Sequence, residues 1–131
     1  MKWKTHAIKS ICKPYSPLNT GGRPIEKNGS LSYLFGVIGN LINEANCKTI
    51  IVNGVEDHVH CFIGLKPVVS VSELMKTVKA KSSKYINDHQ FTKTHFEWQV
   101  GYGFFSYGQS GVYNVYKYIQ NQEAQHQNKL F

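Results

Sequence analysis

The sequence lacks any apolar run long enough to cross a membrane, and its first residues lack the apolar stretch of a secretory signal. Cysteines are few: Cys12, Cys47 and Cys61 are an odd number, and no C-x-x-C pair occurs. Neither a disulfide framework nor a cysteine zinc cluster is therefore indicated. We expect a protein of a reducing cytoplasm that has no membrane partner.

Acidic residues are also scarce, with 8 Asp and Glu against 15 Lys and Arg, which gives a formal net charge of +7. A basic surface favours polyanions, because neutralising phosphates releases counterions. Charge alone does not identify the ligand, since many basic proteins bind no nucleic acid. The chain has 131 residues, of which 41% are hydrophobic, and we expect residues 1–131 to form a single globular domain.

The hydrophobic pattern predicts an α+β fold. A capping box at Ser70 and Glu73 begins one helix, and residues 14–29, rich in proline and glycine, should be a loop. We expect helices over residues 30–45, from residue 71, and from 112 to about 128, and strands over residues 2–12, 49–55, 58–65 and 98–107. This order predicts a ferredoxin-like (RRM-like) sandwich: a four-stranded antiparallel sheet with helices on one face, plus a C-terminal helix that carries tyrosines. That fold alone implies no function.

Two histidines, His58 and His60, alternate with apolar residues inside the third predicted strand. Residues i and i+2 of a strand point to the same face, so both imidazoles project together. Two neutral imidazoles side by side can chelate a divalent metal ion. The alternative is a pair of core histidines whose nitrogens are satisfied by hydrogen bonds, since an isolated H-x-H arises easily by chance.

The last predicted helix places Tyr118 and Gln122 four residues apart, so their side chains share one face. Both lie along one edge of the expected buried stripe, which consists of Val112, Val115, Tyr116 and Ile119. A tyrosine is a competent covalent nucleophile once its proton is removed. A glutamine oxygen can complete the coordination shell of a cation. Spacing alone does not make Tyr118 catalytic, because the sequence contains 8 tyrosines.

Taken together, five motifs resemble the small HUH tyrosine transposases, which are the TnpA-type enzymes of IS200/IS605-like single-strand insertion sequences and their REP-associated relatives. The resemblance runs from about Tyr33 to the last residue. Five ordered motifs at compatible spacing are far more specific than the H-x-H alone. They are residues 55–60 (VEDHVH), 64–67 (GLKP), 79–85 (KAKSSKY), 98–103 (WQVGYG) and 118–123 (YIQNQE) with His126.

The resemblance implies a DNA transposase that cleaves and joins single-stranded DNA beside a hairpin. His58, His60 and Gln122 would be the metal ligands, Mg²⁺ or Mn²⁺ the cofactor, and Tyr118 the nucleophile. Tyr118 would attack the scissile phosphorus while the metal ion polarises the phosphate, leaving a 5′-phosphotyrosine link and a free 3′-OH. Because that link keeps the phosphodiester energy, a second DNA end can reverse the step without ATP.

The resemblance also implies an assembly. The family works as a homodimer in which the tyrosine helix of one chain completes the histidine site of the other, with Gly108 and Gly111 as the hinge. A basic helix would track the DNA backbone, although each of its lysines fits a solvated surface equally well: Lys76, Lys79, Lys81 and Lys84. Four aromatic residues either stack bases or belong to the core: Trp98, Tyr102, Phe104 and Phe105. Such a protein would be bacterial or archaeal, encoded by a mobile element and associated with the nucleoid.

Some residues depart from the family pattern. Residues 10–15 read SICKPY where the family's first strand ends in a short basic stretch, and Gln125 stands where relatives often carry a second histidine. Two other functions stay open: a catalytically weak or inactive nucleic-acid-binding protein on the same fold, and a metalloenzyme acting on a small molecule. The first lacks the basic-aromatic motif of RNA-recognition domains. The second leaves Tyr118, Gln122 and the net charge unexplained.

Overall fold

The structure, a computed structural model, describes residues 4–14, 18, 30–92 and 94–121. The four strands form one antiparallel sheet in the order β2-β3-β1-β4, which is the ferredoxin-like plan. The predicted α+β fold class is therefore confirmed. The elements are β1 (Lys4–Ile11), α1 (Ser30–Glu44), β2 (Lys48–Val55), β3 (His58–Leu65), α2 (Val71–Asp88), β4 (Gly103–Tyr107), a short 3-10 helix (Gln109–Gly111) and α3 (Val112–Gln120).

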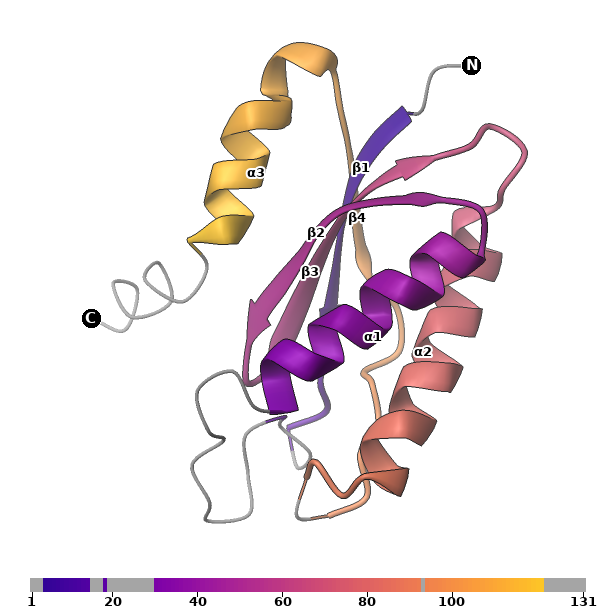
Figure 1. The fold of residues 1–131 in the computed structure, drawn as a ribbon, viewed down its shortest axis with the longest axis vertical. Helices are drawn as coiled ribbons and strands as arrows, with labels where there is room; N and C mark the ends of the chain where they lie inside the picture. Colours follow the sequence, from indigo (N-terminus) through magenta and orange to yellow (C-terminus); the bar gives the residue numbers. More distant parts are fainter. Residues whose placement is uncertain (1–3, 15–17, 19–29, 93, 122–131) are drawn as a thin grey trace.

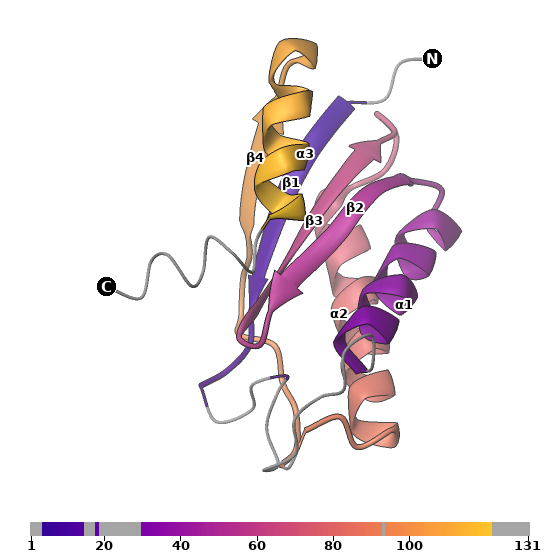
Figure 2. The same ribbon diagram turned by 60° about the vertical axis from the view of Figure 1, so that its left-hand side comes forward.

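Different helices cover the two faces of the sheet (Figure 1; Figure 2). α1 and α2 lie side by side on one face, where they bury the larger apolar cluster together with Val59 and Ile63 of β3. α3 packs on the opposite face, mainly over β2 and β3, where Ile119 meets Ala7 and Phe62. The side chains of β3 alternate between these two clusters, as expected for a strand covered on both sides. The expected buried stripe of α3 is confirmed.

Local signals in the sequence locate several element boundaries. The strand predicted over residues 58–65 is β3 with the same bounds. α2 begins after Ser70, whose hydroxyl accepts the Glu73 N–H at 3.4 Å, so the predicted start of this helix and Ser70 as its N-cap are confirmed. The predicted loop over residues 14–29 falls almost wholly outside the part of the chain that the structure describes, as does the continuation of the last helix beyond residue 121.

The strand predicted over residues 98–107 is too long. Only its second half forms β4, while Trp98 makes an isolated bridge with Cys12 on the end of β1. Between them the chain turns at Gly101, which has a φ of +87° that glycine adopts without strain. The aromatic residues on both sides of this turn made the sequence resemble one long, continuous strand.

The backbones of β2 and β3 approach each other closely at Gly54, which pairs with Val59. A Cβ at residue 54 would overlap the carbonyl oxygen of His58 and lie 2.8 Å from the Cα of Val59. Both atoms belong to the backbone of β3, so a side chain at residue 54 would displace the start of that strand. The absence of a side chain at Gly54 thus fixes the position from which the two histidines project.

Candidate nucleophile and metal site

The histidine pair stands on the sheet face that α3 partly covers. The ring centroids of His58 and His60 are 5.0 Å apart and the rings are nearly perpendicular, at 86°. Nδ1 of His58 lies 2.7 Å from Oδ1 of Asp57. A carboxylate that holds one ring nitrogen in this way orients the imidazole and leaves Nε2 as the nitrogen that can take a metal ion. The predicted projection of both rings to one face is confirmed.

Each neighbouring strand places one polar residue beside His60. Lys9 of β1 and Asn53 of β2 are its direct partners in the two ladders. Directly paired residues of antiparallel strands point to the same face, so both side chains share the face of the imidazole. Asn53 reaches further, because its Nδ2 donates to the carbonyl oxygens of Ile119, at 3.0 Å, and Gln120, at 3.2 Å. Asn53 thereby ties the C-terminal end of α3 to the strand beside the histidines.

Tyr118 lies next to His60 of the same chain. The ring centroids are 6.1 Å apart and the rings are perpendicular, at 90°. The neighbouring residue Ile119 is 1% exposed, whereas Tyr118 remains 37% exposed. Burial of residue 119 therefore anchors the helix and leaves the phenol at the open edge of the site. A helix from a second chain is not needed to bring this phenol to the histidines.

The described part of the chain offers two imidazoles, those of His58 and His60, as donors for a small divalent cation. Among the residues that the structure describes, no three His, Cys, Asp or Glu side chains gather around one point. The predicted third ligand, Gln122, and His126 lie outside those residues, shortly after α3 ends at Gln120. Two adjacent imidazoles, one of them oriented by a carboxylate, fit a divalent metal that completes its shell with oxygen ligands.

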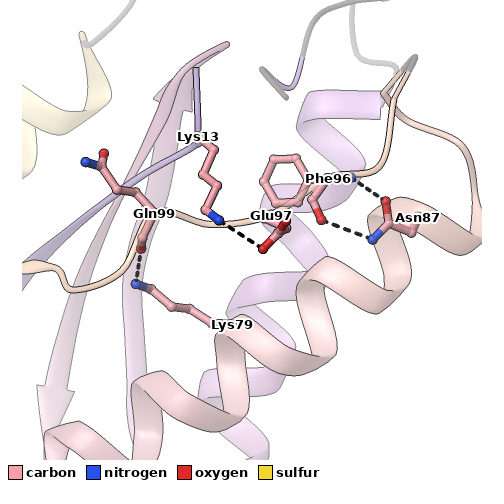
Figure 3. Close-up of polar contacts among 6 residues, drawn as sticks. All are labelled: Lys13, Lys79, Asn87, Phe96, Glu97 and Gln99. Carbon is pink, nitrogen blue, oxygen red and sulfur yellow. Dashed lines mark hydrogen bonds and ion pairs between the residues drawn. The ribbon is translucent and has the colours of Figure 1, made fainter. Parts of the chain in front are cut away.

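A polar network holds residues 96–101 against α2 and the end of β1 (Figure 3). Asn87 of α2 donates from Nδ2 to the Phe96 carbonyl at 3.2 Å and accepts the Phe96 N–H at 2.7 Å. Nζ of Lys13 lies 3.1 Å from Oε1 of Glu97. An open groove of about 840 Å³ runs between α2 and this segment, and its lining includes none of His58, His60 and Tyr118. The network shapes a loop rather than a reaction centre.

Lys79 belongs to the same network. Its Nζ donates to the carbonyl oxygen of Gln99 at 2.9 Å and to that of Gly101, and burial lowers its pKa. Lys84 pairs with Asp88, one turn further along α2, at 2.7 Å. The other two lysines of the predicted DNA-binding set are exposed on α2: Lys76 and Lys81. Contact of these four lysines with DNA stays a prediction, and Lys79 holds the turn at residues 99–101.

The aromatic residues divide between core and surface. Trp98 is 9% exposed and its Nε1 donates to the Ser82 hydroxyl at 2.9 Å, so Trp98 belongs to the core and cannot stack a base. Phe104 stacks on His6, with centroids 4.6 Å apart, on the face of α1 and α2. Phe105 points to the histidine face and is 56% exposed. Of the residues proposed to stack bases, Phe105 is placed best.

The two predicted hinge glycines flank the turn between β4 and α3. The Gly111 N–H donates to the Gly108 carbonyl at 3.0 Å, and Gly111 has φ −92° and ψ −7°, which any residue adopts. Over the described part of the chain, a left-handed φ at a glycine occurs at Gly101 alone. Neither Gly108 nor Gly111 therefore needs glycine in this conformation, and their hinge role stays a prediction about motion.

The three cysteines are buried free thiols. Burial raises the pKa of Cys12 and of Cys61 to about 12. A thiol must ionise to become a strong nucleophile, so these side chains are inert near neutral pH. None of the three cysteines is therefore a candidate nucleophile beside the histidine pair.

The chain belongs to the family of IS200-like transposases, because a model of that family matches residues 23–122. This membership makes it a DNA-processing protein, and the resemblance found in the sequence motifs is confirmed. No curated protein sequence matches the chain. Within the portion of the chain that the structure covers, no helix is long and apolar enough to span a bilayer.

Two solved structures share the fold. One is a protein of Deinococcus radiodurans R1 described as a candidate transposase, with a TM-score of 0.64 and 16% identity over 93% of this chain and 92% of that chain. Another is a REP-associated tyrosine transposase bound to a REP hairpin, with a TM-score of 0.64 and 14% identity over 96% of this chain and 70% of that chain. At such identities the likeness demonstrates a common fold and no common activity.

Proposed function

We propose that the protein cleaves and rejoins single-stranded DNA, using Tyr118 as a covalent nucleophile beside a metal ion held by His58 and His60. The perpendicular contact between the Tyr118 and His60 rings carries this proposal, because it brings a phenol beside two imidazoles that could together hold a metal ion. Membership of the transposase family supports the same reading. Gln122 would complete the ligand set.

The reaction is a transesterification at phosphorus. The Tyr118 oxygen forms a bond to the phosphorus as the bond from phosphorus to the 3′-oxygen breaks. The phenol proton leaves to solvent, and the departing 3′-oxygen takes up a proton to become a free 3′-OH. A 3′-OH from another DNA end reverses these events, so the strand is joined with no nucleotide cofactor.

The chain's own residues orient the reacting groups. A bound Mg²⁺ or Mn²⁺ would supply positive charge to the oxygens of the scissile phosphate. Asp57 fixes the ring of His58, and Asn53 together with the buried Ile119 holds α3 so that the phenol faces His60. The nucleophile is thus positioned before DNA arrives, which lowers the entropic cost of the attack.

The substrate that fits best is a single strand next to a hairpin. One solved neighbour of the same fold is a transposase bound to a REP hairpin, and this chain is basic, with a formal net charge of +7. All the residues of the proposed site that the structure describes come from one chain. The family resemblance predicts a different arrangement, a homodimer with shared sites, and mixing Tyr118→Phe with His60→Ala chains distinguishes the two.

A labelled hairpin-bearing single strand, incubated with Mn²⁺ and resolved on a denaturing gel, tests the chemistry. We expect a covalent protein–DNA adduct that disappears in Tyr118→Phe. Tyr113→Phe is the matched control, because Tyr113 lies on the same helix and is 69% exposed. The control variant should form the adduct as the unmodified protein does.

Two results would contradict the proposal. An adduct that persists in Tyr118→Phe would place the nucleophile elsewhere. DNA binding without any adduct, with Mg²⁺ and with Mn²⁺, would favour the second function considered for this sequence, a nucleic-acid-binding protein without activity.

A further inference from the structure

Part of the sheet face that carries the histidine pair lies outside the cover of α3. That helix packs mainly over β2 and β3, whereas β1 and β4 form the other half of the sheet. On β4, Phe105 is 56% exposed and Tyr107 is 36% exposed. Large apolar rings gain free energy by leaving water, so these two exposed rings beside the proposed site offer an apolar surface that a ligand can cover.

The strand register places Lys9 between the histidines and this ring. Lys9 of β1 pairs with His60 of β3 on one side and with Gly103 of β4 on the other. Direct partners share a face, and Phe105 stands two residues along β4 from Gly103. The side chains of His60, Lys9 and Phe105 therefore share one face of three adjacent strands.

Gly103 makes room for the ring. A Cβ at residue 103 would lie 3.3 Å from Cε2 of Phe105 and 3.6 Å from the Cβ of Lys9. The Phe105 ring thus leans back along β4, over the backbone of Gly103 and toward Lys9. Neighbouring strands are about 4.8 Å apart, so Gly103 lies roughly two such spacings, about 10 Å, from His60. One nucleotide spans a gap of that size.

We propose that Phe105, Gly103 and Lys9 form a subsite for one unpaired nucleotide of single-stranded DNA, next to the histidine pair. The open face of the Phe105 ring stacks the base, as aromatic platforms of single-strand-binding proteins do. The Lys9 ammonium neutralises the adjoining phosphate. This subsite rests on the proposed function for the identity of its ligand, and it would hold the nucleotide that flanks the scissile phosphate.

Binding in EDTA tests the subsite without any chemistry. Fluorescence anisotropy with labelled oligothymidine should show that Phe105→Leu weakens binding by about 5- to 150-fold, the effect of losing one stacked base. Phe104→Leu, which removes the neighbouring ring on the opposite face, should bind as the unmodified protein does. Phe105→Trp should retain the affinity, because it restores an aromatic face and so separates lost stacking from misfolding.

Lys9→Gln should lower the slope of log affinity against log salt by about 0.7, the value for one phosphate of a single strand. Lys48→Gln is its matched control, since it removes an exposed charge at the far end of β2. A duplex of thymidine and adenosine strands should compete poorly, because its bases are already stacked.

Three results would overturn the subsite: unchanged affinity in Phe105→Leu, equal losses in Phe105→Leu and Phe104→Leu, or a duplex that competes as well as the single strand. The failure of the proposed reaction is a separate outcome. If no Tyr118 adduct forms but Phe105→Leu still weakens binding, the subsite stands and the chemistry fails. If the adduct forms but Phe105→Leu binds DNA as tightly as the unmodified protein does, the chemistry stands and the subsite fails.

Discussion

Replacing Asn53 with alanine should loosen the C-terminal end of α3 from the sheet. The Asn53 amide donates to the carbonyl oxygens of Ile119 and Gln120, at 3.0 and 3.2 Å. Each hydrogen bond contributes about 1 kcal/mol net, so the variant should lose about 1–2 kcal/mol of α3 docking. A loss of that size multiplies the undocked fraction of α3 by about 5–30.

Amide hydrogen exchange reports this loss locally. In Asn53→Ala the amides of α3 should exchange about 5–30 times faster. The amide of Ile63 in β3 should keep its protection, because the larger apolar cluster on the other face holds that strand. Asn114→Ala, at an exposed asparagine of the same helix, is the matched control and should leave the exchange of α3 unchanged. Adduct formation should slow in Asn53→Ala, because Tyr118 is less often in place.

The reasoning fails under either of two results. Equal acceleration in α3 and β3 would show that Asn53 stabilises the whole domain. No acceleration at all would show that the apolar contacts of Ile119 hold α3 without the amide. Asn53→Asp should loosen α3 more than alanine does, because a carboxylate would face two carbonyl oxygens.

Three further predictions follow from the same geometry. Asp57→Ala should weaken Mn²⁺ binding by about 10- to 100-fold, because the His58 ring loses its orienting partner; paramagnetic resonance titration measures this, and unchanged affinity would remove Asp57 from the site. Mixing Tyr118→Phe with His60→Ala chains should restore no adduct, because the phenol and the imidazole of the proposed site lie side by side within one chain; recovery would support the shared-site homodimer that the family resemblance predicts. Burial raises the pKa of Cys61 from 9.0 to about 12, so the folded state holds this proton more tightly than the unfolded chain does. The stabilisation is full below about pH 9 and is lost as the pH rises toward 12. In urea denaturation, the free energy of unfolding by which the unmodified protein exceeds Cys61→Ala should therefore shrink across that range. An excess that grows with pH would contradict the burial argument.

Patterns local in the sequence predicted most of the fold. The alternation around His58 and His60 gave β3 its bounds and put both imidazoles on one face, because side-chain direction in a strand follows from residue count. The capping box likewise located the start of α2. These features depend on neighbours along the chain, so no knowledge of distant contacts was needed.

Contacts between residues far apart in the chain could not be predicted from the sequence. The amide of Asn53 contacts residues 119 and 120, and no local pattern links a polar residue in a strand to the end of a helix that follows much later. Nothing local in the sequence indicated that Lys79 donates to two carbonyls in the turn that interrupts the predicted strand, whereas its contact with DNA stays a prediction. The two glycines of the WQVGYG motif did indicate a turn. The sequence could not show that Lys79 of α2 donates hydrogen bonds to the carbonyl oxygens of that turn.

Gly54 extends the requirements of the proposed site to a residue that contributes no side chain to it. Even alanine there collides with the backbone at His58 and Val59, so the start of β3 would shift and the imidazoles with it. A mutational survey scored by transposition should therefore rank residue 54 with the histidines themselves. Such a survey would include the end of β2 in the proposed site, although Gly54 contributes only the space left by a missing methyl group.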